Sequence, residues 1–168
     1  MSGNSIRIIL SGILVCMMLL FGCPQYLHGD GLHVAMTHHL FHANVMHLAV
    51  NCLSIWTLFR RDVRYGLTPL VFAYVIGTVS WYFTHSDPVG FSNIIFAIIG
   101  LRTPSLSNGW WKQSVVIVFL AVTALMALLP QVSAVTHIVS FVLGCLAAGA
   151  QRIIVSIGRD YRRATYNQ

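Results

Sequence analysis

Charged residues are scarce in this sequence, and glutamate is absent from it altogether. Of the 168 residues, 57% are hydrophobic and 8% are charged, whereas a typical soluble domain carries about 25% charged residues. The composition therefore excludes an ordinary soluble domain and indicates an integral membrane protein. The net charge of +6 does not indicate nucleic-acid binding, because the basic residues lie in short clusters between apolar segments and not along one face.

The sequence also lacks the common motifs of metal and disulfide sites. No CxxC pair and no HExxH motif occurs, so neither a zinc site nor a disulfide framework is indicated. We expect no metal and no cofactor. The four cysteines stand singly in or beside apolar segments, where we expect them to act as small apolar residues: Cys16, Cys23, Cys52 and Cys145.

Six apolar segments follow one another along the chain and predict an all-α integral membrane protein. They cover residues 6–22, 45–59, 66–84, 91–101, 113–129 and 133–155, against about 20 residues for a helix that crosses the bilayer. The fourth segment is short, so its outer end must stop below the membrane surface, inside the other helices, and leave a water-accessible recess above it. We predict a single membrane domain of six transmembrane helices over residues 1–168, with residues 156–168 as a short basic tail.

The basic residues predict the orientation of these helices. The connections 23–44, 85–90 and 130–132 contain no lysine or arginine, only Asp30 and Asp87. By the positive-inside rule, both termini are cytoplasmic, and the second, fourth and sixth helices begin on the outer side. No transit-like extension precedes the first segment, so we expect the inner membrane of a bacterium. All ten basic residues fall on the cytoplasmic side of this arrangement: Arg7, Arg60, Arg61, Arg64, Arg102, Lys112, Arg152, Arg159, Arg162 and Arg163.

Four polar residues converge on one layer near the outer surface. His47 and Asn51 come early in the second segment, Ser92 opens the fourth, and His137 lies a few residues into the sixth. At about 1.5 Å per helical residue, all four should lie roughly 5–10 Å below the outer surface. Ionisable residues within a membrane span usually face a bundle interior or a cavity and serve function. The alternative is that these groups only hold the helices together through hydrogen bonds.

These residue types can support acyl transfer. A serine becomes a nucleophile when a neighbouring base accepts its proton, and histidine suits that role near neutral pH. Ser92 and His137 can therefore form a catalytic dyad. No aspartate lies within a predicted span, so we do not expect a buried Ser-His-Asp triad. Asn51, His47 and the backbone N–H of Ser92 are the candidate donors to the oxyanion.

Three separated motifs resemble those of the rhomboid intramembrane serine proteases. The stretch from Thr37 to Asn51 is similar to the second-span signature of that family, in which a histidine and an asparagine four residues later complete the oxyanion hole. Gly90-Phe91-Ser92 is similar to the glycine-x-serine motif around the nucleophile. His137, followed by Gly144, resembles the catalytic histidine of the sixth span and its small-residue packing face.

The resemblance implies both a fold and an activity. The implied fold is the six-helix rhomboid core in a lipid bilayer. The implied activity is hydrolysis of a peptide bond in or beside a transmembrane segment of a membrane-protein substrate, without a cofactor. The resemblance also implies supporting roles, including packing of an aromatic ring against the catalytic histidine, for Gly90, Phe96, Gly100, Gly144, His38 and His42.

Three features depart from the family pattern. The first outer connection is short and has His33-Val34 near the place where the family often has a Trp-Arg pair. The family usually has glycine directly after the nucleophile, where this chain has Asn93, and glycine is common three residues after the catalytic histidine, where this chain has Ser140. The Asn93 side chain either crowds the helix start or adds a further donor. A catalytically inactive relative that binds membrane-protein clients is therefore the first alternative function.

The remaining histidines and aromatic residues have simpler expectations. A metal or haem site built on His38 and His42, which are four residues apart, with His47 nearby, is a second alternative, since imidazole binds several metals, but no carboxylate or thiolate at ligand spacing accompanies them. The sequence assigns no role to His39. Aromatic residues at the ends of predicted spans are typical of the membrane interface: Trp81, Tyr82, Phe83, Trp110 and Trp111.

Overall fold

The computed structural model describes residues 1–23, 31–59, 66–84, 89–103 and 133–166, and within these ranges the chain is helical with no strand. The predicted fifth span, residues 113–129, lies outside the described residues. The first four predicted spans each begin within three residues of the start of an observed helix, and the sixth predicted span begins one residue before the start of α7. The helices are α1 (Gly3–Phe21), α2 (Leu32–Thr37), the 3₁₀ helix η1 (His38–Leu40), α3 (Val45–Leu58), α4 (Thr68–Thr84), α5 (Ser92–Arg102) and α7 (Ala134–Tyr166).

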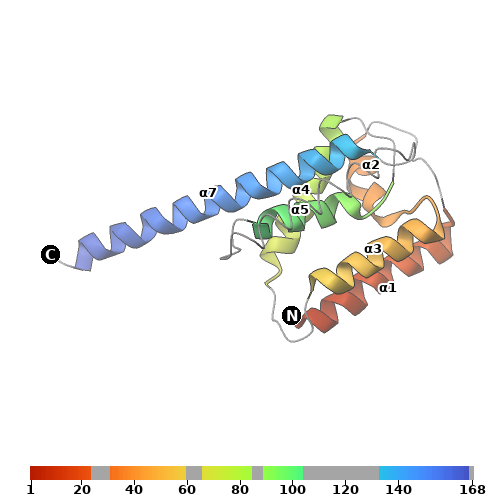
Figure 1. The fold of residues 1–168 in the computed structure, drawn as a ribbon, viewed down its shortest axis with the longest axis horizontal. Helices are drawn as coiled ribbons and strands as arrows, with labels where there is room; N and C mark the ends of the chain where they lie inside the picture. The colour runs from red at the N-terminus through yellow and green to blue at the C-terminus, as the bar shows by residue number, and fades with distance from the viewer. Residues whose placement is uncertain (24–30, 60–65, 85–88, 104–132, 167–168) are drawn as a thin grey trace.

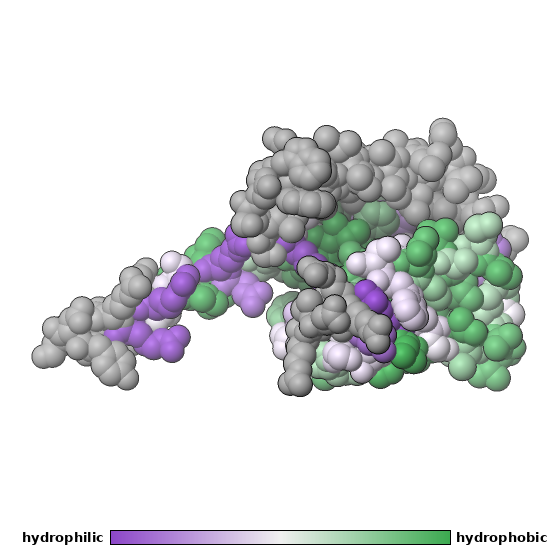
Figure 2. Space-filling model, turned by 60° about the horizontal axis from the view of Figure 1, so that its bottom comes forward, coloured by the Kyte–Doolittle hydropathy of each residue, from purple (hydrophilic) through white to green (hydrophobic). Residues whose placement is uncertain are grey.

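Two of these helices are long and apolar enough to cross a membrane, namely α1 and the part of α7 from Ala134 to Arg159. Helices α3 and α5 are apolar but shorter. Large apolar side chains are exposed on the outside of the described helices, for example Leu19, Met46 and Leu146, and apolar residues cover much of the face of the bundle seen in Figure 2. Such a surface fits a lipid environment, because a soluble protein rarely exposes large apolar patches.

Helix α7 continues further than the sequence predicts. The predicted sixth span ends at residue 155, but the helix runs through Tyr166 and extends well beyond the bundle (Figure 1). The prediction followed the apolar run, which breaks where Arg152 and Arg159 enter. Helix formation does not need apolar residues, and arginine, glutamine and alanine are all good helix formers. The hydrophilic residues form a stripe along this free part of α7 (Figure 2).

Helix α5 is the central element of the bundle. It packs against α7, α4 and α3, and its residues from Ser92 to Ile98 are all buried, as is Gly100. A helix that is apolar all round is one that is covered on every side. Figure 1 shows α5 alongside α4 and α7, while α1 and α3 lie side by side as a separate pair.

The backbones of α5 and α7 touch through two glycines. A Cβ atom at Gly100 would collide with the carbonyl oxygen of Phe141, and one at Gly144 would lie 2.5 Å from the carbonyl oxygen of Ala97. Small residues at a helix interface in a membrane permit this close approach. Because neither helix can slide without breaking the contact, the glycines fix the depth of Ser92 relative to the start of α7.

The connection between α1 and α3 is folded against α4. It forms α2 and η1, where Val34 and Ala35 make a small buried cluster with Trp81 of α4. The Tyr74 hydroxyl of α4 donates a hydrogen bond to the carbonyl oxygen of Met36 at 2.6 Å. No apolar periodicity announces these short helices, so the sequence predicted only a connection here.

The prediction that Trp81 lies at the membrane interface is wrong. Trp81 is only 5% exposed and its ring stacks on the His38 ring, with 4.8 Å between the centroids. Tyr82 and Phe83, by contrast, are exposed, as an interfacial position requires. Trp110 and Trp111 lie outside the described residues. The α2 connection covers Trp81, and residue type alone does not reveal such a cover.

Candidate active site

Ser92 and His137 meet at the N-terminal ends of α5 and α7. The Oγ atom of Ser92 lies 2.7 Å from Nε2 of His137, and both side chains are buried. Ser92 is the first residue of α5, and His137 lies in the first turn of α7. The distance is that of a hydrogen bond between a hydroxyl donor and a neutral imidazole acceptor. This arrangement allows direct transfer of the serine proton to the imidazole.

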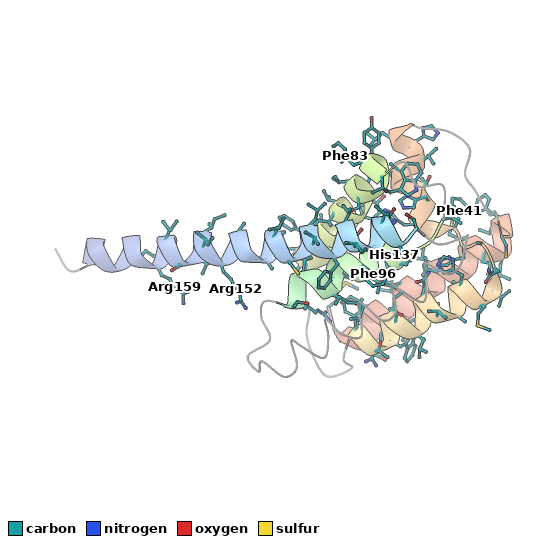
Figure 3. All side chains as sticks on the ribbon, turned by 45° about the horizontal axis from the view of Figure 1, so that its top comes forward. Phe41, Phe83, Phe96, His137, Arg152 and Arg159 are labelled. Atoms are coloured by element: carbon teal, nitrogen blue, oxygen red, sulfur yellow. The ribbon has the colours of Figure 1, made fainter. Side chains whose placement is uncertain are left out.

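The orientation of the His137 ring depends on packing. Phe96, one helical turn after Ser92, lies against it with 4.5 Å between the ring centroids and 35° between the ring planes, and Figure 3 shows the two rings side by side. Among the described residues, Nδ1 of His137 has no hydrogen-bond partner. No described carboxylate therefore orients the imidazole, which is held by Ser92 on one side and by Phe96 on another.

Helix α3 brings His47 against the chain just before Ser92. The side chain of Asn44 caps this helix, since its Oδ1 accepts a hydrogen bond from the His47 N–H at 2.8 Å. A Cβ atom at Gly90 would lie 2.5 Å from Cε1 of His47, and Gly90 also has a φ of +149°. Glycine is therefore required at position 90 for two reasons, the backbone conformation and the close approach of the imidazole.

Asn51 lies one turn further along α3, on the same helix face as His47. It is only 2% exposed, and within the described part of the chain its Nδ2 has no hydrogen-bond partner. Buried amide donors are almost always paired in folded proteins. A free, buried donor on the face shared with His47 is what an oxyanion would require.

The start of α5 supplies backbone donors at the same place. The N-cap residue is Phe91, which provides no side-chain cap, and the first helical hydrogen bonds are those from the N–H groups of Ile94 and Ile95 to the Phe91 carbonyl. The N–H groups of Ser92 and Asn93 precede them and have no partner within the helix. The helix start therefore presents two donors and the positive end of the helix dipole.

Of the remaining predicted site residues, His38 and His42 lie in the connection that covers α4 and α5. Both are fully buried. Nδ1 of His38 donates a hydrogen bond to the carbonyl oxygen of Ala35 at 2.8 Å, and the His38 carbonyl accepts one from the Gly90 N–H at 3.1 Å. The His42 ring lies edge-on to His47, with 5.2 Å between the centroids. Both residues therefore pack around the site without reaching the Ser92 hydroxyl.

His39, to which the sequence assigned no role, is a packing residue between helices. Its Nε2 is hydrogen-bonded to Oγ1 of Thr78 at 3.2 Å, and its ring lies close to Tyr74. Gly77 makes room for it, because a Cβ atom there would lie 3.2 Å from Cε1 of His39. The sequence signal for this contact was weak, since a histidine beside two others is compatible with many roles.

Burial lowers the pKa of three histidines, His38, His39 and His42, and keeps them uncharged. It lowers the pKa of His38 from 6.5 to about 4. Burial, together with the nearby His47, lowers the pKa of His42 to about 3. The pKa of His39 lies well below 6.5 for the same reason, with His38 adding to the effect. Within the described ranges, no group of three or more histidine, cysteine or acidic residues is arranged to hold a metal ion.

Asn93 and Ser140, which depart from the expected pattern, are both buried. The amide of Asn93 contacts His38, with Nδ2 at 3.3 Å from Nε2 of that ring. Ser140 is fully buried in α7, and its Oγ has no hydrogen-bond partner among the described residues. The contact between Asn93 and His38 was not expected from the sequence, which offered only crowding or an extra donor at this position.

A family model described as the Rhomboid domain matches residues 29–152 of this chain, which include α2, α3, α4, α5 and the first half of α7. The comparisons with curated proteins and with solved structures gave no match.

Proposed function

This chain belongs to the rhomboid family, and we propose that it is an intramembrane serine endopeptidase. Its substrates would be membrane proteins, cleaved at peptide bonds in or next to their transmembrane segments. The observation that carries the proposal is the distance of 2.7 Å between Oγ of Ser92 and Nε2 of His137 in a buried setting. The free amide of Asn51 and the donors at the start of α5 support it.

The proposed reaction proceeds in two steps. Nε2 of His137 takes the Ser92 proton, and Ser92 Oγ attacks the scissile carbonyl. The resulting oxyanion accepts hydrogen bonds from His47, Asn51 and the Ser92 N–H, and His137 then protonates the leaving amine. Water, activated by His137, hydrolyses the acyl-enzyme and releases Ser92.

The membrane setting is the second part of the proposal. We propose six spans, with both termini cytoplasmic, in the inner membrane of a bacterium. Helix α5 has 11 residues and is therefore about 16 Å long, roughly half the thickness of the hydrocarbon core. This length supports a recess above Ser92 through which water reaches the site, while the substrate enters laterally from the bilayer.

Labelling with a fluorescent fluorophosphonate tests the proposal. We expect labelling of the wild type, and its loss by at least about 10³-fold in Ser92→Ala and His137→Ala, because nucleophile and base act as a unit. Ser80→Ala is the matched control: Ser80 is a buried helical serine whose hydroxyl is tied to its own helix, at Ile76 O. It should label like the wild type.

A second assay with a single-span reporter substrate should give the same ranking by cleavage. A folded wild type that neither labels nor cleaves would contradict the protease and favour the inactive relative that binds membrane-protein clients. Persistent labelling of Ser92→Ala would place the reactive serine elsewhere.

A further inference from the structure

His38 holds the chain on both sides of the proposed nucleophile. Its backbone carbonyl accepts a hydrogen bond from the Gly90 N–H, two residues before Ser92, at 3.1 Å. Its side chain meets Asn93, the residue directly after Ser92, with 3.3 Å between Nε2 and Nδ2. One residue of the outer connection is therefore bonded to the backbone before the serine and to the side chain after it.

The direction of the side-chain bond follows from its neighbours. The carbonyl oxygen of Ala35 can only accept, so Nδ1 of His38 must carry the proton that it shares at 2.8 Å. A neutral imidazole with its proton on Nδ1 has a lone pair on Nε2. The Asn93 amide must therefore donate to Nε2, and the hydrogen bond exists only while His38 is neutral.

The surroundings hold this pair rigidly. Asn93 is 5% exposed and His38 is fully buried. Against the His38 ring lie Trp81 from α4, stacked at 4.8 Å between centroids, and His39 from η1, at 3.7 Å. Of the groups that these contacts bring to the ring, Trp81 and Asn93 are uncharged and His39 is kept neutral by burial. The amide therefore has a fixed acceptor rather than solvent.

We propose that Asn93 is a positioning residue that fixes the first turn of α5, and with it Ser92, through its hydrogen bond to His38. The inference rests on the proposed protease function. No side chain caps the start of α5, so the bonds of Gly90 and Asn93 to His38, beside the bond of Ser92 to His137, hold this turn in place. The orientation of the Ser92 hydroxyl and N–H depends on that turn, and displacements of about 1 Å in such groups can cost 10²-fold in rate.

The positioning role and the alternative, that the Asn93 side chain crowds the helix start, predict opposite effects of glycine at position 93 on the reaction rate. If the Asn93 side chain obstructs the helix start, glycine at this position should raise the rate. If Asn93 positions Ser92 through His38, both Asn93→Gly and Asn93→Ala should slow the reaction. Alanine keeps good helix propensity, so its use separates loss of the amide from the added flexibility of glycine.

The experiment compares second-order rates of fluorophosphonate labelling and reporter cleavage for the full-length protein in detergent. We expect Asn93→Ala and Asn93→Gly to lower both rates by about tenfold or more, with kcat falling and KM unchanged, at an unfolding temperature close to that of the wild type. His38→Ala should lower the rates similarly, and adding Asn93→Ala to it should lower them little further, because both changes break the same bond.

The Asn93→Asp variant distinguishes the hydrogen bond to His38 from simple packing, because only the hydrogen bond makes the rate of this variant depend on pH. A carboxylate cannot donate to the lone pair on Nε2, so the contact re-forms only when His38 is protonated. The rate of this variant relative to the wild type should therefore rise as the pH falls from about 8 to about 6, because the carboxylate favours the charged imidazole. A ratio independent of pH would contradict the bond to His38.

The outcomes separate the inference from the function on which it rests. A labelled wild type with an equally fast or faster Asn93→Gly variant overturns the positioning role and leaves the protease intact. A folded wild type that is not labelled overturns the protease, and the positioning role with it. Slow labelling of the Asn93→Ala and Asn93→Gly variants, with the pH-dependent recovery of Asn93→Asp, supports the inference.

Discussion

Helices α5 and α7 meet in two different ways along their length. Close to the C-terminal end of α5, Gly100 and Gly144 bring the two backbones into direct contact, and neither position has room for a Cβ atom. At the N-terminal ends of the two helices, Ser92 and His137 meet through a hydrogen bond between side chains. The backbone contact fixes the register of α5 against α7, while the side-chain contact joins two groups between which a proton can be transferred.

The two contacts are mechanically linked. Ser92 and Gly100 are eight residues apart on one helix, which is about 12 Å. A change in helix separation at the glycines therefore reaches the N-terminal end of α5, where a hydrogen bond tolerates only a few tenths of an ångström. The geometry of the Ser92–His137 pair therefore depends on a contact between two glycines.

The largest effect is expected from breaking the backbone contact. In Gly144→Ala the new methyl group meets the Ala97 carbonyl at 2.5 Å and the Leu101 N–H nitrogen at 3.0 Å, and backbone atoms cannot give way as side chains do. We expect the free energy of unfolding in detergent to fall by about 3 kcal/mol, with loss of fluorophosphonate labelling.

Gly149→Ala is the matched control, one and a half turns further along α7. Among the described residues, a Cβ atom at Gly149 meets nothing within 4 Å, so this variant should be as stable as the wild type or more stable by about 0.5–1 kcal/mol. Equal stability of the two variants would show that the glycine contact does not hold α5 against α7.

The next largest effect is expected from pH, which should lower the free energy of unfolding through the buried histidines. Because burial lowers the pKa of His42 to about 3 from 6.5, the unfolded chain binds a proton there between these values and the folded chain does not. Stability is therefore fully present above pH 6.5 and falls by about 1.4 kcal/mol per pH unit for this histidine as the pH drops toward 3. The same holds for His38 down to about pH 4.

Unfolding titrations of the wild type and His42→Leu at several pH values check this expectation. Below pH 6.5, the free energy of unfolding of His42→Leu should fall less steeply with decreasing pH than that of the wild type, by about 1.4 kcal/mol per pH unit, which corresponds to one proton. Gly149→Ala should follow the wild-type slope. Parallel curves for His42→Leu and the wild type would show that the buried imidazole takes up its proton in the folded state as readily as in the unfolded state.

The part of this architecture that follows a simple period could be predicted from the sequence. Apolar runs located α1, α3, α4, α5 and the start of α7, because each run must be covered or face lipid. Alternation of the spans placed Ser92 and His137 at one depth, and the structure brings them to hydrogen-bond distance. Their catalytic roles, and the orientation of the whole chain in the membrane, stay predictions.

The contacts around the reactive pair could not be predicted in the same way. The bond between Asn93 and His38 depends on how α2 and η1 fold over α4, and that connection contains no repeating pattern. The burial of Trp81 depends on the same cover. The far end of α7 was missed because arginines end an apolar run without ending a helix. Contacts between regular helices could be predicted from the spacing of residues along the sequence. Contacts made by an irregular segment could not, because its path is not repeated in the sequence pattern.

The smallest effect is expected from a third contact of α7, which joins its first turn to α4. Oγ1 of the fully buried Thr136 lies 2.7 Å from Oγ1 of Thr84 and 2.7 Å from Oγ of Ser133. Thr136→Val keeps the shape of the side chain but leaves the Thr84 hydroxyl without this partner. We expect the free energy of unfolding to fall by about 1 kcal/mol, and labelling to slow only a few-fold, because Phe96 still holds the ring of the adjacent His137. Thr57→Val is the matched control, since that exposed hydroxyl donates a hydrogen bond within its own helix, to the carbonyl oxygen of Ser54, and the change should alter neither quantity. A loss of labelling as complete as in His137→Ala would mean that side-chain contacts with α4, and not the glycine contact with α5, set the position of the base.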